Sequence, residues 1–476
     1  MAILCENCGH DPTADQRAAL SKLNAELAQF KTHIPALEQK RQAIIDRLNA
    51  VVYPVLTLPP EITSRIFVHC LPHHGRVRPS PRSAPLVLTQ ICGRWRAIAL
   101  STGELWTSLD VTANVLRPGR DDLLKTWFSR AKRYPLSWTI RRPGFKQLHN
   151  GASAHIADII PKVHRLEVIM PEEGFRRIMP LDTFLPLLQC LAAPLSSESL
   201  QAVLRCAPLL RELTIWESGL SFIVASKTLR RLELAGGVLH PIPVFLGILE
   251  NCPLLSHLKI AVDVSLDPNP SPIAFSNIRS LDLVCGAWAL KFVTLPNLTH
   301  LEYEDLTTDI LQAFLFRSSC IIKSLSCSIP STPEGVKARL GMFPWVETLE
   351  LRLTISGGVH MLGEAISCLD PDVTSLVPQL RHITIQSRSP KNIDFLQIID
   401  FLKCRPELRS FRLIRENPSD DRWRPRRTAA AEFEALRLLG VHFSIHFWKP
   451  SHRSPNDSYN NKESTEVWPK NAMDPC

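Results

Sequence analysis

The sequence lacks the long apolar runs and the motifs that would assign it to a membrane or to a common enzyme class. Its 476 residues contain no uninterrupted run of about 18 apolar residues, so we expect no membrane span. The start at Met1–Leu4 has no apolar region typical of a secretory signal, which predicts an intracellular protein, cytoplasmic or nuclear. A glycine-rich phosphate loop, an HExxH zinc helix and a GxSxG elbow are absent from the sequence. We therefore expect neither enzymatic activity nor a cofactor.

Charge and cysteine content exclude further classes. A net charge of +9 is mild for this length, and the basic residues are spread out, so we expect no nucleic-acid partner. The 13 cysteines lie mostly singly inside apolar runs, which favours buried, reduced thiols. Cys5 and Cys8, followed by His10, have the spacing of half a zinc site. No second ligand pair follows at a suitable distance, so we expect no metal.

The most informative stretch runs from residue 56 to 111. Pro59 and Pro60 are suited to the first turn of a helix, which Pro72 ends. A second helix is expected from Leu86, and a short turn carries Leu105 and Trp106. Three short helices in about 50 residues bury little apolar surface by themselves, so the rest of the chain or a partner must cover some of it. The apolar positions are Ile62, Ile66, Phe67, Cys70 and Leu71, then Leu88, Ile91, Cys92, Trp95, Ile98 and Ala99.

This stretch resembles an F-box. The resemblance is carried by Leu58-Pro59-Pro60-Glu61-Ile62, Ile66-Phe67 and Leu71-Pro72, then by the run 91–99 (ICGRWRAIA) and Leu105-Trp106. It implies a small helical bundle that docks on the SKP adaptor of a cullin–RING ubiquitin ligase. The stretch departs from the family pattern at 73–85, a Pro-, Arg- and Ser-rich insertion. The residues that the resemblance implies for adaptor binding are Leu58, Pro59, Ile62, Ile66, Phe67, Leu71, Leu88, Ile91, Cys92, Trp95 and Ile98.

Residues 20–52 have the pattern of a coiled coil, and residues 1–19 are expected to be a flexible segment. Apolar residues recur at alternating steps of three and four, interrupted only by Arg41. Pro35 lies inside the pattern and is expected to kink or split the helix. Two interpretations stay open: a helical hairpin folded on the F-box-like stretch, or a dimerisation helix that forms a homodimer through residues 20–51. The stripe is Leu20, Leu23, Leu27, Phe30, Ile34, Leu37, Ile44, Leu48 and Val51.

A short phrase recurs between residues 120 and 447, as in CAPLLRELTI at 206–215 and CPLLSHLKI at 252–260. The spacing of about 25 residues resembles irregular leucine-rich repeats, although the asparagine expected after each strand is mostly absent. We expect an α/β fold in which stacked units share a core and a parallel sheet. The first strand residues of the units are Leu213, Leu232, Leu258, Leu281, Leu301, Leu325, Leu349, Ile383 and Phe411.

Binding on such a solenoid would use exposed strand positions and the loops that follow them. A strand over 443–447 is expected to cap the sheet, and 448–476 to be a disordered tail. Arg422–Arg427 is best explained as a solvated basic loop, with nucleic-acid binding as the alternative. The candidate binding positions are Trp216, Glu217, Glu302, Glu304, Arg352 and Gln386.

The resemblance to an F-box, together with the repeats, implies a substrate-recognition subunit of an SKP–cullin–F-box ubiquitin ligase. Its F-box would bind the adaptor, its solenoid would bind a protein target, and a cullin scaffold would complete the complex. The alternative is a protein-interaction scaffold that dimerises through its N-terminal helices and has no ligase role.

Overall fold

One long parallel sheet organises the molecule. The computed structural model describes residues 13–49, 54–72, 75–116, 122–141, 155–216, 223–236, 238–263, 271–304, 306–328, 332–353, 360–369, 376–387, 395–416, 432–433, 435–437, 440–448 and 465–466. Within these residues, fifteen strands pair in chain order, and every neighbouring pair is parallel except the last one. Chain-order pairing with one strand per unit is the topology of a solenoid.

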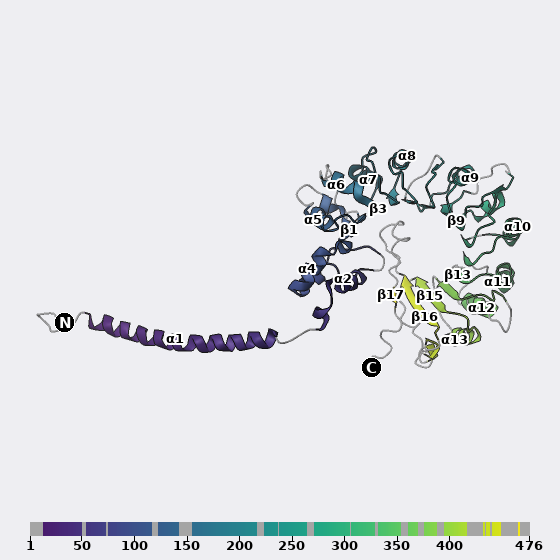
Figure 1. Ribbon diagram of the computed structural model, residues 1–476. Coiled ribbons are helices and arrows are strands. Elements are labelled where there is room, and N and C mark those ends of the chain that lie inside the picture. The colour runs from purple at the N-terminus through teal and green to yellow at the C-terminus, as the bar shows by residue number, and fades with distance from the viewer. Residues whose placement is uncertain are drawn as a thin grey trace, which may run out of the picture.

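The strands line the inner side of an arc, and most of the helices lie along its outer side (Figure 1). The strands are β1 (Ser108–Thr112), β2 (Leu136–Arg141), β3 (Val163–Ile169), β4 (Cys190–Pro194), β5 (Glu212–Trp216), β6 (Arg231–Leu234), β7 (His257–Ala261), β9 (Ser280–Cys285), β11 (His300–Tyr303), β12 (Ser324–Ser328), β13 (Thr348–Leu353), β14 (His382–Ser387), β15 (Ser410–Glu416), β16 (His442–Trp448) and β17 (Thr465–Glu466). Two short strands, β8 (Ile273–Ala274) and β10 (Val293–Thr294), form a separate parallel pair.

The outer helices of the solenoid alternate with the strands. They are α5 (Asp122–Arg130), α6 (His155–Ile159), α7 (Glu172–Ile178), α8 (Ser197–Cys206), α9 (Ile242–Asn251), α10 (Thr308–Ser318), α11 (Pro333–Leu340), α12 (His360–Leu369) and α13 (Phe395–Cys404). Shorter 3-10 turns occur at η3 (Ala113–Leu116), η4 (Ile160–Lys162) and η5 (Ala287–Phe292).

The register of the sheet confirms the repeat positions that the sequence predicts. Leu213 on β5 pairs with Leu232 on β6, which pairs with Leu258 on β7, and the same column continues to Phe411 on β15. These side chains are buried together with the residue two positions later in the same strand, such as Ile215. Because side chains alternate across a strand, each unit turns two apolar residues toward the helices. The fold is thus α/β, a leucine-rich-repeat-like solenoid.

The sheet begins earlier than the sequence predicts. β1 begins inside the stretch 56–111 and pairs with β2, so the F-box-like stretch and the solenoid share one hydrophobic core. Trp106 comes from the F-box-like stretch and Trp127 from α5 of the solenoid. Both are buried, and their rings meet edge to face with centroids 4.9 Å apart. The boundary expected between 111 and 120 is therefore not a break in packing.

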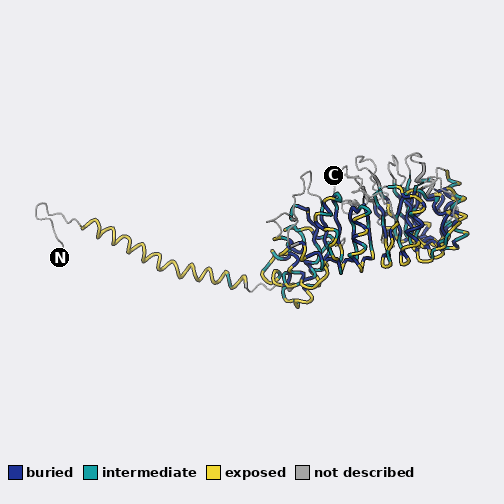
Figure 2. Tube along the Cα trace, turned by 90° about the horizontal axis from the view of Figure 1, so that it is seen from above, coloured by how far each residue is buried: buried dark blue, intermediate teal, exposed yellow. Residues whose placement is uncertain are grey.

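The N-terminal helix is continuous. α1 spans Ala14–Asn49 with Pro35 inside it, so of the two expected effects of Pro35, a kink or a split, the split does not occur. Its side chains are exposed almost throughout and it projects away from the solenoid (Figure 2). The hairpin folded on the F-box-like stretch is therefore not formed.

At the other end, β16 extends the sheet beside β15 as predicted. The expected tail 448–476 needs a correction, since Trp448 belongs to β16 and Thr465–Glu466 form β17, which pairs antiparallel with β16. The rest of that segment, the half zinc site at 5–10 and the basic cluster at 422–427 lie outside the described residues.

Candidate functional site

The F-box-like stretch folds as a small helical module at the start of the solenoid. It consists of η1 (Pro54–Thr57), α2 (Pro60–His69), α3 (Leu88–Ile91), α4 (Gly93–Ser101) and η2 (Gly103–Trp106). The expected second helix is interrupted at Cys92, whose extended backbone separates α3 from α4 and whose sulfur accepts from the Trp95 N–H at 3.5 Å. A polar side chain at this position satisfies a free donor of the first helical turn, which is why a new helix starts there.

Aromatic contacts hold the helices of this module together. The rings of Phe67 on α2 and Trp95 on α4 meet edge to face with centroids 4.9 Å apart. The guanidinium of Arg94 donates to the carbonyl of Leu58 at 3.1 Å, and the Trp106 indole donates to the carbonyl of Ala99 at 2.9 Å. These contacts fix the apolar face of α2 relative to α4.

The predicted adaptor-binding residues divide into two groups. Phe67, Leu88 and Ile98 are buried in the core of the protein itself, so the expectation that they contact a partner needs correction. They instead support the helices from inside. The other members are exposed or half-buried: Leu58, Pro59, Ile62, Ile66, Leu71, Ile91, Cys92 and Trp95.

Three isoleucines stand out in the exposed group. Ile62 and Ile66 lie one turn apart on α2 and are 51% and 44% exposed, and Ile91 at the end of α3 is 56% exposed. Burying a large aliphatic side chain is worth about 1.5–3 kcal/mol. The module therefore leaves apolar surface uncovered, as its small size predicts.

The described part of the insertion, residues 75–85, lies against the sheet. The carbonyl of Val77 accepts from the Asp110 N–H at 2.7 Å, and the Ser108 hydroxyl donates to the carbonyl of Gly75 at 2.5 Å. Val77 itself is buried. Because β1 is the first strand of the sheet, this segment covers an edge that would otherwise present unpaired backbone groups.

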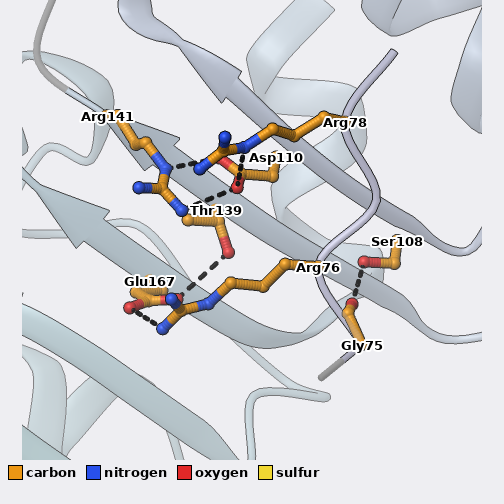
Figure 3. A network of polar contacts seen from close by, with 8 residues as sticks. All are labelled: Gly75, Arg76, Arg78, Ser108, Asp110, Thr139, Arg141 and Glu167. Carbon is orange, nitrogen blue, oxygen red and sulfur yellow. Dashed lines mark hydrogen bonds and ion pairs between the residues drawn. The ribbon is translucent and has the colours of Figure 1, made fainter. Parts of the chain in front are cut away.

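Arginines of the insertion reach acidic residues on the inner face of the first three strands (Figure 3). Arg76 pairs with Glu167 on β3 at 2.5 Å, and Arg78 pairs with Asp110 on β1 at 3.2 Å. Arg141 on β2 donates twice to the same Asp110, at 2.8 Å each, and Thr139 donates to Glu167 at 3.1 Å. This network orients the helical module relative to the solenoid.

Polar side chains follow one register position along the inner face of the arc. Thr214, Glu233, Lys259, Asp282 and Glu302 sit beside each other on β5, β6, β7, β9 and β11. A hollow of about 250 Å³ lies over these strands. Lys259 and Asp282 line it and form an ion pair, so this surface carries paired charges.

Two histidines line the same hollow. His257 receives or donates a hydrogen bond with Ser256 at 2.8 Å, and His300 lies two strands further along the sheet. Burial lowers the pKa of both imidazoles, which favours their neutral forms at neutral pH.

The exposed strand positions chosen from the sequence are only partly correct. Arg352 on β13 forms ion pairs with Glu302 and, at 3.7 Å, with Glu304, so these three residues make one cluster. Gln386 is the register neighbour of Arg352 on β14. Trp216 is buried rather than exposed, although it lines the hollow over these strands. Glu217 lies outside the described residues.

A second hollow of about 680 Å³ separates α2 from the turn after α5. Glu61 and Arg65 line it from α2, and Lys132 and Tyr134 line it from the turn. Lys132 donates to the carbonyl of Ser101 at 2.9 Å, which ties that turn to the end of α4.

The described residues contain no group of three or more His, Cys, Asp or Glu side chains placed to hold a metal ion. Burial raises the pKa of the Cys190, Cys320 and Cys327 thiols to about 11, so these thiols stay protonated at neutral pH. No helix among the described residues is long and apolar enough to cross a membrane.

No family model matches the chain, and no curated protein matches it. Among solved structures, a chain of "Crystal structure of Rad7 and Elc1 complex in yeast" is 11% identical over 90% of this chain and 97% of that chain, with a TM-score of 0.33. The leucine-rich repeat-containing protein LegL7 from Legionella pneumophila is 14% identical over 82% of this chain and 95% of that chain, with a TM-score of 0.26. Likeness at this level carries no information about function.

Proposed function

We propose that this chain is the substrate-recognition subunit of an SKP–cullin–F-box E3 ubiquitin ligase. The proposal rests on one observation, the exposure of Ile62, Ile66 and Ile91 on the helices that resemble an F-box. A module this small covers its own aromatic core but leaves these side chains in water, which is the surface an adaptor would bury.

The solenoid would hold the protein target. Its inner face offers a continuous row of polar side chains over β5–β11, and the Arg76 and Arg78 contacts fix that face relative to the adaptor-binding helices. A fixed geometry would place the target near the ubiquitin-carrying arm of the ligase, and the rate gain would come from proximity. No catalytic step is assigned to a side chain of this protein. Such a subunit would work in the cytoplasm or the nucleus.

The test is binding to purified SKP adaptor. The double variant Ile62→Asp, Ile91→Asp places two carboxylates on the proposed contact surface, and we expect the Kd to rise about 100-fold or more. Phe316→Asp is the matched control, because Phe316 is an exposed apolar residue on α10, far along the chain from the helical module.

The control should bind like the wild type, and circular dichroism should show that both variants are folded. Equal binding by the double variant and the control would refute the proposed docking surface.

A second candidate function is a scaffold that dimerises through α1 and has no ligase role. The exposed apolar stripe of α1 is the observation that favours it. Adaptor binding separates the two functions, since a scaffold without a ligase role would fail to bind the adaptor whatever its oligomeric state.

A further inference from the structure

The apolar stripe of α1 has no cover among the described residues. Eight of its large apolar side chains are between 51% and 68% exposed, and all eight belong to one helix. The helix has 36 residues and is thus about 54 Å long at 1.5 Å per residue. The stripe consists of Leu20, Leu23, Leu27, Phe30, Ile34, Leu37, Ile44 and Leu48.

The spacing fixes which surface fits this stripe. Its first step is three residues and the next is four, so Leu20 takes position a of a heptad and Leu23 takes position d. The a positions continue through Leu27, Ile34, Arg41 and Leu48. A seam of alternating a and d side chains packs into the equivalent seam of another helix. The only helix among the described residues that carries such a seam is α1 itself.

We propose that α1 pairs with α1 of a second copy of this chain as an antiparallel two-stranded coiled coil. The orientation follows from Arg41. In a parallel pair in register, each a residue faces its own copy, so two Arg41 guanidinium groups would meet inside the seam.

The antiparallel pairing removes this repulsion. We place the two-fold axis between residues 35 and 36. Residue n of one helix then lies opposite residue 71 − n of the other helix, so each a residue faces a d residue. Ile34 then faces Leu37, Leu27 faces Ile44, and Arg41 faces Phe30. An arginine against an aromatic ring is a favourable contact, because the ring face attracts the cation.

The charges beside the seam also fit this register. In an antiparallel pair, e positions of one helix face e positions of the other. Lys31 of each helix therefore faces Glu38 of its partner, which gives two such pairs. At the g positions, Glu26 of each helix likewise faces Arg47 of its partner, which gives two more pairs. The remaining g pair, His33 with Lys40, carries like charge only when the imidazole is protonated. Four opposite-charge pairs therefore flank the apolar seam.

Pro35 is compatible with the proposed pairing. It occupies a b position, on the outer side of the helix, and it lies next to the two-fold axis. Any bend that it introduces would occur at the same height in both helices. The C-terminal ends of the two helices would lie at opposite ends of the coiled coil, about 40 Å apart, so the dimer would present two solenoids separately. Two target-binding faces on one particle increase apparent affinity for a target that carries two sites.

The first experiment measures the mass of the full-length chain in solution. We expect a dimer at about 10 μM chain, because a dimer Kd below that concentration leaves most chains paired. Leu27→Asp with Ile34→Asp should give a monomer. The control Gln39→Asp, at an outward f position, should remain a dimer. A wild-type monomer, or a dimer unaffected by the two seam substitutions, would overturn the proposal.

The second experiment decides orientation. Lys31→Glu places a carboxylate against Glu38 in the antiparallel dimer and should raise the dimer Kd about five- to thirtyfold. Adding Glu38→Lys restores opposite charges across the antiparallel interface, so the double variant should recover. In a parallel dimer the double variant would stay weak, because Glu26 would face the carboxylate introduced by Lys31→Glu. Failure to recover would refute the antiparallel arrangement. Adaptor binding does not involve these residues, so this proposal and the ligase proposal can fail independently.

Discussion

Asp110 offers the sharpest test of the network that joins the insertion to the solenoid. Its side chain is almost fully buried and accepts from Arg141 at 2.8 Å twice and from Arg78 at 3.2 Å. Asp110→Ala would leave the half-buried Arg141 guanidinium without this partner. Removing one member of a buried ion pair costs about 3–5 kcal/mol, and solvent screening at the exposed Arg78 places the expected loss near 3 kcal/mol.

Urea unfolding at neutral pH measures this loss. The matched control is Glu212→Ala, which removes the exposed pair between Arg165 and Glu212 on nearby strands of the same sheet. Exposed pairs contribute about 0–1 kcal/mol, so the control should change the unfolding midpoint little. Hydrogen exchange should also accelerate along β1 in the Asp110 variant, above all at the backbone N–H of residue 110, which donates to the carbonyl of Val77. If the two variants lose the same stability, the insertion does not anchor the helical module in this way.

Two further predictions concern the solenoid itself. Gly286 has a φ of 73°, and a Cβ there would lie 2.1 Å from the carbonyl oxygen of Val262, so Gly286→Ala should lower the free energy of unfolding by at least about 1–2 kcal/mol. A thermal melt unchanged from the wild type would contradict this. Burial alone would raise the pKa of Glu172, but hydrogen bonds from Ser196 and Ser199 outweigh it and the pKa is lowered. A lowered folded-state pKa adds stability above the unfolded pKa, and this contribution is lost as pH falls through the folded value. Glu172→Gln should therefore be less stable than wild type at pH 7, with a difference that shrinks toward pH 3; a constant difference across that range would refute the assignment.

The repeat architecture could be predicted from sequence because its signal is local and periodic. Leu213 and the eight residues that follow it in the same column were placed by spacing alone, and the sheet register confirms each of them. Burial of the second and fourth residues of a strand depends only on the alternation of side chains, which a sequence shows directly.

The candidate site was less predictable, because exposure depends on what packs over a residue. Phe67 and Ile66 are adjacent in the sequence and equally apolar, yet Trp95 covers the first and nothing in the described chain covers the second to the same extent. Trp216 likewise looked like an exposed strand position and is buried. The insertion held one usable signal, the alternation of Arg76, Val77 and Arg78, which is typical of an extended segment with one buried face.

The sequence by itself determined the periodic features: the solenoid, the heptad-like apolar stripe of α1 and the helical character of the stretch around residues 60–106. Each is encoded by residues within one or two turns or strands of each other. Only the tertiary structure decided that the helical module shares a core with β1 and that Ile62, Ile66 and Ile91 remain exposed. It also decided that Arg76 pairs with Glu167, which lies 91 positions later in the chain. Those outcomes depend on contacts between segments that are distant in the sequence. The curvature and packing of the whole sheet set the geometry of these contacts, so a local sequence pattern does not predict it.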